Sequence, residues 1–285
     1  MSVKTVIIGH RDPDGIFSAS VAKMATLEND ALAPIEMHDV QYGEKPLADE
    51  IVMGNNIYVV DFSYSRETLL RWKEISNSLV VLDHHESAQK NLAGLDFCIF
   101  DMKKAGVRLT WEYFYGDAEL PPVLEYVEDR DLFKLQLPNC RAFMTVLQKF
   151  VNTDEALYFE AVKMIEDDGY FLSLLTAEQL AVAQYEEQQI ERLASYYYWK
   201  YIDGERVPVV NCRMWGSDVC AILYKKFPNV PFVATYFETP DRDNIDIVNR
   251  VYSLRSAEHG ANIAEICMKY GGGGHAHAGG FTVPA

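Results

Sequence analysis

The chain has 285 residues, 49% of them hydrophobic, and a formal net charge of −16 at pH 7. Its length and apolar fraction allow one large domain or two modest domains with well-formed cores. The acidity argues against the broad basic surface with which proteins hold long DNA or RNA non-specifically, because phosphate contacts supply that affinity. A short anionic substrate, held by metal ions and a few arginines, is compatible with this charge.

The cysteine and hydropathy patterns indicate a reducing compartment and no membrane contact. The five cysteines include no Cys-x-x-Cys pair and their number is odd, so we expect free thiols. Residues 1–4 lead directly into a strand-like run and lack the apolar region of a signal peptide. No run approaches the roughly 18 apolar residues of a membrane span. We therefore expect a cytoplasmic protein.

Residues 1–135 alternate strand-like and helix-like patterns. Short β-branched runs predict strands at residues 6–9, 35–40, 57–60, 79–82 and 97–100. Apolar residues at helical spacing predict helices at residues 16–27, 65–76 and 105–116. Such alternation is typical of a parallel sheet with helices on both faces.

The second half of the chain begins with helix. Residues 154–199 are acidic and free of proline, and residues 176–199 read as one long helix that could connect two domains. We expect the aromatic stretch 196–199 to be core rather than a surface that stacks bases. Beyond residue 204, strands at 207–211, 232–237 and 247–254 and helices near 217–227 and 260–269 predict a smaller α/β domain.

Three of the expected strands run into acidic or histidine residues. Ligands of open α/β sheets bind at the carboxyl ends of strands, so neighbouring strands would bring these side chains together. Carboxylates that close cannot all stay ionised without cations between them, and oxygen with imidazole is ligand chemistry for Mn²⁺, Fe²⁺ or Zn²⁺. The pattern predicts a two-metal hydrolase. The residues concerned are His10, Asp12, Asp14, Asp61, Asp83, His84 and His85.

Each of these motifs also has a plain structural interpretation. Residues 12–15 could be a polar turn that caps a helix, Asp61 a strand-end cap, and residues 128–131 a solvated helix surface. The clustering of five of the seven histidines in three short motifs favours the metal interpretation. We expect one of Asp129 and Asp131 to be a further ligand.

The C-terminal region offers a candidate anion site. The glycine run 271–274 can present several backbone N–H groups to an anion, and His275 adds a donor. The apolar residues 281–283 that follow indicate an ordered turn rather than a flexible tail. Arg255 ends an expected strand and could hold a phosphate through two hydrogen bonds, although an ordinary surface arginine is the alternative.

Taken together, these motifs resemble the DHH phosphoesterase superfamily. The matching segments are His10-x-Asp12-x-Asp14-Gly15, Asp61, Asp83-His84-His85, Asp129 within residues 128–131, residues 253–256, and the glycine-rich segments 272–275 and 278–280. The resemblance implies a two-domain α/β fold with the active site in the cleft between the domains. A DHH-like parallel-sheet domain would span residues 1–175, a helical connector 176–202, and a DHHA1-like domain 203–285.

The resemblance also implies roles for individual residues. His10 and Asp12 would hold one metal ion, Asp14, His84 and Asp129 the other, and Asp61 would bridge the two. Asp83 would orient the histidine pair, and His85 would face the scissile phosphate. Catalysis would also use Arg255, and substrate would be held by Arg255, Ser256, Gly273, Gly274 and His275. The cofactor would be two Mn²⁺ ions, with Mg²⁺ or Co²⁺ as substitutes.

The activity implied is that of a phosphodiesterase or exoribonuclease. It would trim very short single-stranded RNA, or dinucleotides, to mononucleotides, without acting on long duplexes. Alternatives are a cyclic dinucleotide phosphodiesterase and a polyphosphate or 3′-phosphonucleotide hydrolase. A non-catalytic nucleotide sensor would be expected to lack metal ligands, and all of the matched ones are present. A homodimer is compatible with the resemblance.

Overall fold

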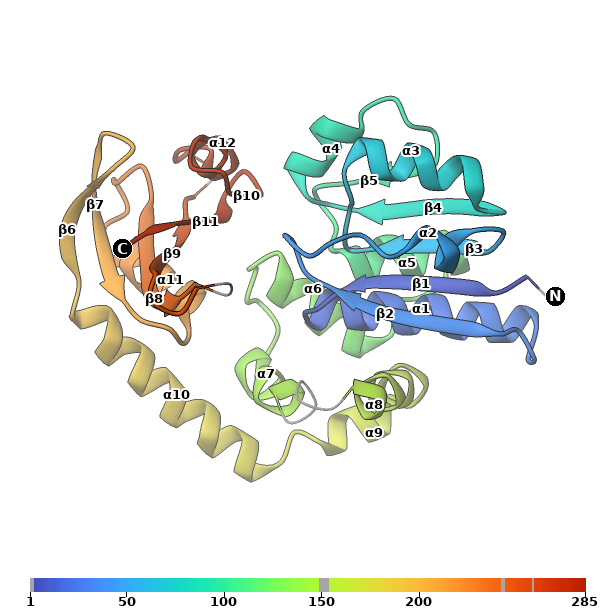
Figure 1. Ribbon diagram of the computed structural model, residues 1–285. Coiled ribbons are helices and arrows are strands. Elements are labelled where there is room, and N and C mark those ends of the chain that lie inside the picture. Colours follow the sequence, from blue (N-terminus) through green and yellow to red (C-terminus); the bar gives the residue numbers. More distant parts are fainter. Residues whose placement is uncertain (1–2, 149–153, 242–243, 258) are drawn as a thin grey trace. The chain divides into compact units, whose positions relative to one another are not determined.

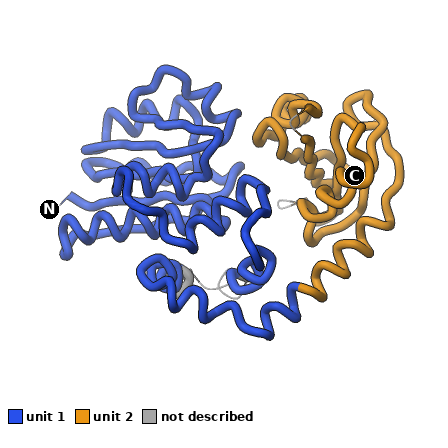
Figure 2. The backbone as a smooth tube through the Cα atoms, turned by 180° about the vertical axis from the view of Figure 1, so that it is seen from behind, with its two compact units in different colours: residues 1–183 blue, residues 184–285 orange. Residues whose placement is uncertain are grey.

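The computed structural model describes residues 3–148, 154–241, 244–257 and 259–285. The chain divides into two compact units, residues 1–183 and residues 184–285 (Figure 2). The division falls inside helix α10 (Ala177–Ser195), which lies within the connector expected from the sequence.

Unit 1 contains a parallel sheet whose strand order is β2-β1-β3-β4-β5, which can be followed in Figure 1. The expected α/β architecture with a parallel N-terminal sheet is confirmed. The strands are β1 (Thr5–His10), β2 (Ile35–Val40), β3 (Asn56–Val60), β4 (Ser78–Asp83) and β5 (Cys98–Phe100). The helices are α1 (Pro13–Asn29), α2 (Asp49–Val52), α3 (Arg66–Ile75), α4 (Glu86–Leu92), α5 (Gly106–Tyr115), α6 (Pro122–Asp131), α7 (Cys140–Gln148), α8 (Asp154–Glu166) and α9 (Asp168–Ser173).

Both faces of this sheet are buried, which explains why its strands are continuous apolar runs rather than alternating ones. In β1, Ile7 packs into a core with α1, α5 and α6. Its neighbours Val6 and Ile8 point to the opposite face and pack with Leu69 and Trp72 of α3. The helices therefore cover the two faces and leave the ends of the strands for polar groups.

Unit 2 contains a mixed sheet of order β10-β11-β9-β8-β7-β6, in which only the β7–β8 pair is parallel over the described residues. One core lies between this sheet and α12, and another includes α11 and the end of α10. The elements are β6 (Tyr198–Ile202), β7 (Glu205–Asn211), α11 (Gly216–Lys226), β8 (Val233–Pro240), β9 (Val248–Arg255), α12 (Ile263–Lys269), β10 (Gly273–Gly274) and β11 (Ala278–Pro284).

The long helix expected over residues 176–199 is too long at its C-terminal end. Helix α10 stops at Ser195, and Tyr198 already belongs to β6. A two-residue turn, Asp203-Gly204, joins β6 to β7, and both of its residues have positive φ (52° and 83°). Asp-Gly is a strong signal for this kind of hairpin, and aromatic residues favour strands.

The aromatic stretch 196–199 is also less buried than expected. Tyr196 is 62% exposed and Trp199 is 37% exposed, whereas Tyr197 packs against the core that includes α11, so the interpretation as core is correct for Tyr197 and wrong for the rest of the stretch. The cysteines are free in the described residues, as expected. None of the helices in the described part of the chain combines the length and the apolar character needed to cross a bilayer.

Candidate metal centre

The acidic and histidine residues of unit 1 meet at the carboxyl edge of its sheet. Strands β1, β3 and β4 are neighbours and run parallel, so they end at the same edge. His10 is the last residue of β1, Asp61 directly follows β3, and Asp83 is the last residue of β4. The topology therefore brings the three sequence motifs together.

Asp61 lies at the centre of this group and is 1% exposed. Its Oδ1 lies 3.0 Å from Nε2 of His84, and its Oδ2 lies 3.5 Å from Nδ1 of His10. The backbone of Asp61 has φ 53°, a left-handed conformation that costs on the order of 1 kcal/mol for a residue with a side chain. Aspartate is among the residues that tolerate it best. The strained turn is what directs this carboxylate into the cluster.

Asp12 connects the start of helix α1 with His10. One oxygen, Oδ1, accepts a hydrogen bond from the backbone N–H of Gly15 at 3.0 Å and so caps the helix. The other oxygen, Oδ2, lies 2.8 Å from Nδ1 of His10. On its far side, Nε2 of His10 lies 2.6 Å from the amide oxygen of Gln41. His10 is thus held with Nδ1 facing the carboxylates.

Asp14 is 2% exposed and is fixed by the N-terminus of helix α5. Its two oxygens accept hydrogen bonds from the backbone N–H groups of Gly106 (2.6 Å) and Val107 (2.7 Å). A Cβ on Gly106 would lie 2.5 Å from Cβ of Asp61, so no side chain can stand at this position without movement. Sequence reasoning missed Gly106, although the glycine at the start of an expected helix was the available signal.

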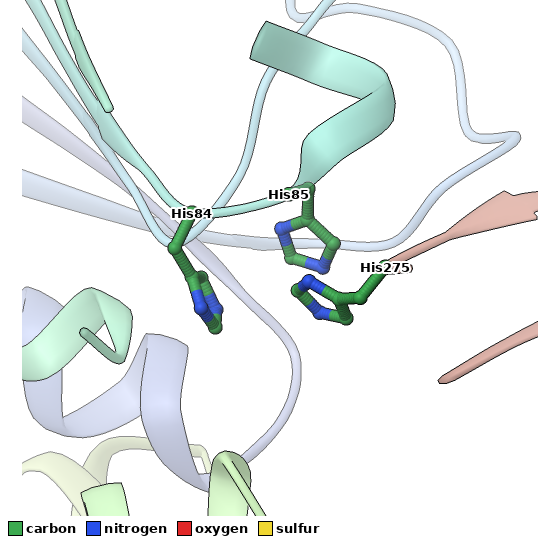
Figure 3. Close-up of side chains that lie close together, drawn as sticks. All are labelled: His84, His85 and His275. Carbon is green, nitrogen blue, oxygen red and sulfur yellow. The ribbon is translucent and has the colours of Figure 1, made fainter. Parts of the chain in front are cut away.

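Asp83 organises the two histidines that follow it and is fully buried. Its Oδ1 accepts hydrogen bonds from the backbone N–H groups of His84 (2.7 Å) and His85 (3.2 Å) and lies 2.7 Å from Nδ1 of His85. Its Oδ2 accepts a hydrogen bond of 2.5 Å from the hydroxyl of Ser63. Figure 3 shows His84 and His85 between β4 and α4. Their ring planes are inclined by 65° to each other. His275, also labelled there, belongs to unit 2.

At the end of helix α6, Asp131 joins the cluster and Asp129 does not. Oδ2 of Asp131 lies 3.5 Å from Nε2 of His84. The carboxylate of Asp129 instead accepts hydrogen bonds from the backbone N–H groups of Gln136 and Leu137, at 2.9–3.2 Å. Asp129 therefore closes the turn after α6, and of the two acids named from the sequence it is Asp131 that lies beside His84.

The arrangement has the chemistry of a binding site for divalent cations. Three groups of potential ligands share Asp61, namely His10 with Asp12, Asp14 with His84, and Asp83 with His85. Within each group the ligand atoms lie within 4.8 Å of one another. In the described residues, Nδ1 of His10 and Oδ2 of Asp61 are buried without a hydrogen bond of acceptable geometry. Carboxylate oxygen and imidazole nitrogen suit manganese, iron and zinc.

The electrostatics of the cluster also favour bound cations. Burial alone would lower the pKa of His10, but the adjacent carboxylates of Asp12 and Asp61 raise it to about 11. Burial and the charges of Asp61 and Asp131 raise the pKa of Asp14 well above its ordinary value. Burial raises the pKa of Asp131 to about 6. A bound cation would favour the ionised forms of Asp14 and Asp131 and so offset both shifts.

In unit 2 the predicted substrate-binding residues gather at one end of strands β9, β11 and β10. Arg255 ends β9 and pairs in register with Ala278, the first residue of β11. Its guanidinium donates a hydrogen bond of 2.6 Å to the hydroxyl of Ser217 at the start of α11. Ser256 follows β9, and its backbone N–H bonds to the carbonyl oxygen of His277 at 2.9 Å.

The glycine-rich segment forms a tight hairpin around His275. Gly273 and Gly274 pair with residues 279–280 of β11, and the backbone N–H of His275 bonds to the carbonyl oxygen of Ala278 at 2.6 Å. A Cβ on Gly274, whose φ is 139°, would lie 2.3 Å from that same oxygen. The hairpin therefore requires glycine for its shape.

Comparisons with known proteins connect this geometry to a known fold. No family model matches the chain. It is 29% identical over 241 residues to an uncharacterized protein of Acanthamoeba polyphaga mimivirus. That match covers 81% of this chain and 54% of the viral protein, so the chain spans about half the length of this curated relative.

Two solved structures resemble the whole chain. RecJ from Thermus thermophilus, solved in complex with Mn²⁺, has a TM-score of 0.54 at 12% identity, over 98% of this chain and 49% of RecJ. PggH from Vibrio cholerae, a pGpG-specific phosphodiesterase, has a TM-score of 0.50 at 16% identity, over 99% of this chain and 93% of PggH. The chain therefore shares the fold of these two structures over nearly its whole length.

Proposed function

We propose that the protein is a metal-dependent phosphodiesterase that hydrolyses dinucleotides or very short single-stranded RNA to mononucleotides. In this proposal unit 1 is the catalytic part of the chain and unit 2 binds substrate. The observation that carries the proposal is the convergence of three ligand groups on the single carboxylate of Asp61. A buried cluster of this kind is costly to fold without a counter-charge, and binding cations would remove that cost.

The contacts in unit 1 support two ligand sets. One cation would be held by His10, Asp12 and Asp61, and the second by Asp14, Asp61, His84 and Asp131. We infer Mn²⁺ as the physiological ion, because the ligands mix imidazole with carboxylate and because the RecJ structure was solved with Mn²⁺. When bound, a pair of cations would act as Lewis acids on the phosphate and lower the pKa of the attacking water.

The remaining residues of unit 1 would position the substrate. Because Asp83 engages Nδ1 of His85, the opposite nitrogen, Nε2, would donate to a phosphoryl oxygen as charge develops there. Ser63 would hold Asp83 in place. This is the arrangement in which a carboxylate fixes both the orientation and the tautomer of a catalytic histidine.

The hairpin end of unit 2 would bind the anionic part of the substrate. Arg255 offers two donors in a planar fork, a geometry that matches a phosphate. His275 would add an imidazole donor, and Ser256, Gly273 and Gly274 would lie beside it at the same end of the sheet. The net charge of −16 supports a short substrate, since a long strand would require many cationic contacts to its phosphates. The pGpG specificity of PggH supports a dinucleotide.

The test is a substrate panel with purified protein, with and without Mn²⁺. The panel contains pApA, a 5-mer and a 24-mer RNA, cyclic di-AMP, a 3′-phosphonucleotide and inorganic polyphosphate, with products separated by chromatography. We expect Mn²⁺-dependent conversion of pApA and the 5-mer to mononucleotides, with the 24-mer spared.

Other results would redirect or overturn the proposal. Cleavage of cyclic di-AMP, or release of phosphate from polyphosphate or the 3′-phosphonucleotide, without cleavage of pApA would assign one of the alternative phosphoesterase activities. Absence of any hydrolysis with Mn²⁺, Mg²⁺ and Co²⁺, together with tight nucleotide binding, would favour a non-catalytic sensor.

A further inference from the structure

Tyr42 lies at the edge of the metal cluster on a tight turn after strand β2. The backbone N–H of Glu44 bonds to the carbonyl oxygen of Gln41 at 3.1 Å, and Gly43 has φ 89°. This is the pattern of a type II turn, which requires a positive φ at its third residue. Tyr42 is the second residue of the turn.

The turn is fixed by its neighbours. Arg11 donates a hydrogen bond of 3.0 Å to one carboxylate oxygen of Glu44, and the other oxygen accepts from the backbone N–H of Gln41 at 3.1 Å. The side chain of Gln41 in turn lies 2.6 Å from Nε2 of His10. The position of Tyr42 is therefore tied to a proposed metal ligand.

Three rings hold the phenol ring of Tyr42. The ring of Phe62 lies 4.5 Å from it, and the rings of His10 and His85 lie 5.4 and 5.5 Å away, between centroids. Phe62 is itself buried at 3% exposure and packs on Tyr64. Even so, 45% of Tyr42 remains exposed. It is thus a rigid, partly open aromatic surface in contact with both histidines at the proposed reaction centre.

A single exposed tyrosine is common on protein surfaces and needs no explanation by itself. Two observations distinguish Tyr42. Its ring contacts His10, a proposed ligand, and His85, the proposed donor to the phosphate. Its turn is anchored from both sides, so little conformational freedom remains to be lost when a planar group stacks on it. A nucleobase next to the scissile phosphate meets these conditions, and inorganic polyphosphate has no group that does.

We propose that Tyr42 is the stacking surface for the nucleobase adjacent to the scissile phosphate, and that it selects nucleotide substrates over base-free polyphosphates. This inference rests on the proposed function, and it adds the recognition of a base to it. Stacking of this kind tolerates all bases, because every base has a π face, and its strength is greatest for purines with their larger rings.

The experiment compares KM values of wild type, Tyr42→Ala, Tyr42→Phe and Tyr42→Trp with Mn²⁺. The substrates are pApA, pCpC and a matched 5′-phosphorylated dinucleotide analogue that lacks both bases. Stacking is worth about 1–3 kcal/mol per base, which corresponds to a rise in KM of roughly 5- to 140-fold for pApA in Tyr42→Ala. We expect no change for the base-free analogue, and near wild-type KM values for the Phe and Trp variants.

Two controls separate stacking from damage to the cluster. Mn²⁺ affinity of Tyr42→Ala, measured by calorimetry, should equal that of wild type. Tyr113→Ala removes another tyrosine of unit 1, 42% exposed and on helix α5, and should leave every KM unchanged. A loss of Mn²⁺ affinity in Tyr42→Ala would overturn the inference by assigning Tyr42 a structural role.

The remaining outcomes are also decisive. An unchanged KM for pApA in Tyr42→Ala, or an equal rise for the base-free analogue, would overturn the inference and leave the proposed function intact. A wild-type protein that hydrolyses none of the three substrates would instead overturn the proposed function, and the inference with it.

Discussion

The acidic cluster of unit 1 and the glycine hairpin of unit 2 gather polar groups by opposite means. In unit 1, buried charged side chains hold one another, and backbone N–H groups are directed at carboxylates such as Asp14 and Asp83. In unit 2, Gly274 lets two backbone segments approach so closely that even a methyl group would collide. The first arrangement depends on charge, whereas the second depends on shape.

This difference predicts different consequences of small substitutions. In unit 1, replacing Asp by Asn keeps the shape and removes the charge, so metal binding and turnover should fall while the fold persists. In unit 2, replacing Gly by Ala adds volume without altering charge, so local stability and substrate affinity should fall while metal binding persists.

Asp61→Asn should have the largest effect. The variant loses the carboxylate shared by all three ligand groups, and several kcal/mol of Lewis-acid stabilisation correspond to a roughly thousandfold or greater fall in kcat. Asparagine tolerates the left-handed backbone, so the circular dichroism spectrum should be unchanged. His84→Ala should lower kcat by a similar factor. Full activity in either variant would contradict the two-metal assignment.

The next largest effect distinguishes the role of Asp131 from that of Asp129. Asp131→Asn should reduce kcat by about 100-fold or more, because it removes a charge beside His84. Asp129→Asn should keep most of the activity and destabilise unit 1 by about 1–2 kcal/mol, because it weakens the turn at Gln136 and Leu137. Steady-state kinetics over an Mn²⁺ titration measure kcat, and urea unfolding measures the stability. The reverse pattern would return the ligand role to Asp129.

Gly106→Ala tests whether the cluster depends on close packing by helix α5. The added Cβ would press on Asp61, so we expect a loss of about 1–3 kcal/mol in unfolding free energy and a 10- to 100-fold weaker Mn²⁺ affinity. Gly169→Ala on helix α9 is the matched control, since its Cβ would meet only the Asp167 side chain at 3.2 Å. Equal unfolding free energies of the two variants would show that α5 can move away from Asp61 without a loss of stability.

Gly274→Ala should have the smallest effect on chemistry. We expect a KM several-fold above wild type, a loss of about 1–3 kcal/mol in stability, and unchanged Mn²⁺ affinity. Gly271 has a positive φ of 77°, and an added Cβ there would meet no neighbouring atom. Gly271→Ala therefore measures the cost of backbone strain by itself, about 1 kcal/mol. If Gly274→Ala bound Mn²⁺ more weakly and Gly271→Ala did not, the metal cluster would depend on the shape of the hairpin, and the proposed distinction between charge and shape would be wrong.

Much of unit 1 was predictable because its strands carry a strong local signal. Runs such as residues 57–60 and 79–82 are β-branched and end in acid, and parallel strands share one edge, so the meeting of Asp61 with Asp83 and His84 followed from pattern and topology. Strand β6 was missed, although the Asp203-Gly204 hairpin signal was present in the sequence.

The remaining features depended on geometry that the sequence does not carry locally. Residues 129 and 131 differ by about 200° around a helix, so they point to nearly opposite sides, and only the rotation of α6 decides which one meets His84. The contact of Gly106 with Asp14 joins positions 92 residues apart and depends on how α5 docks.

The bonds between Asp14 and the start of α5 also bear on the order in which the protein matures. They join residues that are 92 and 93 positions apart in the sequence, so no short segment of the chain can form a complete site while the rest is unfolded. Long-range contacts of this kind form late in folding, because the chain must lose the entropy of closing a long loop before the contact can stabilise it. A nascent or partly degraded chain would therefore take up Mn²⁺ poorly, and metal loading would report on the integrity of all of unit 1.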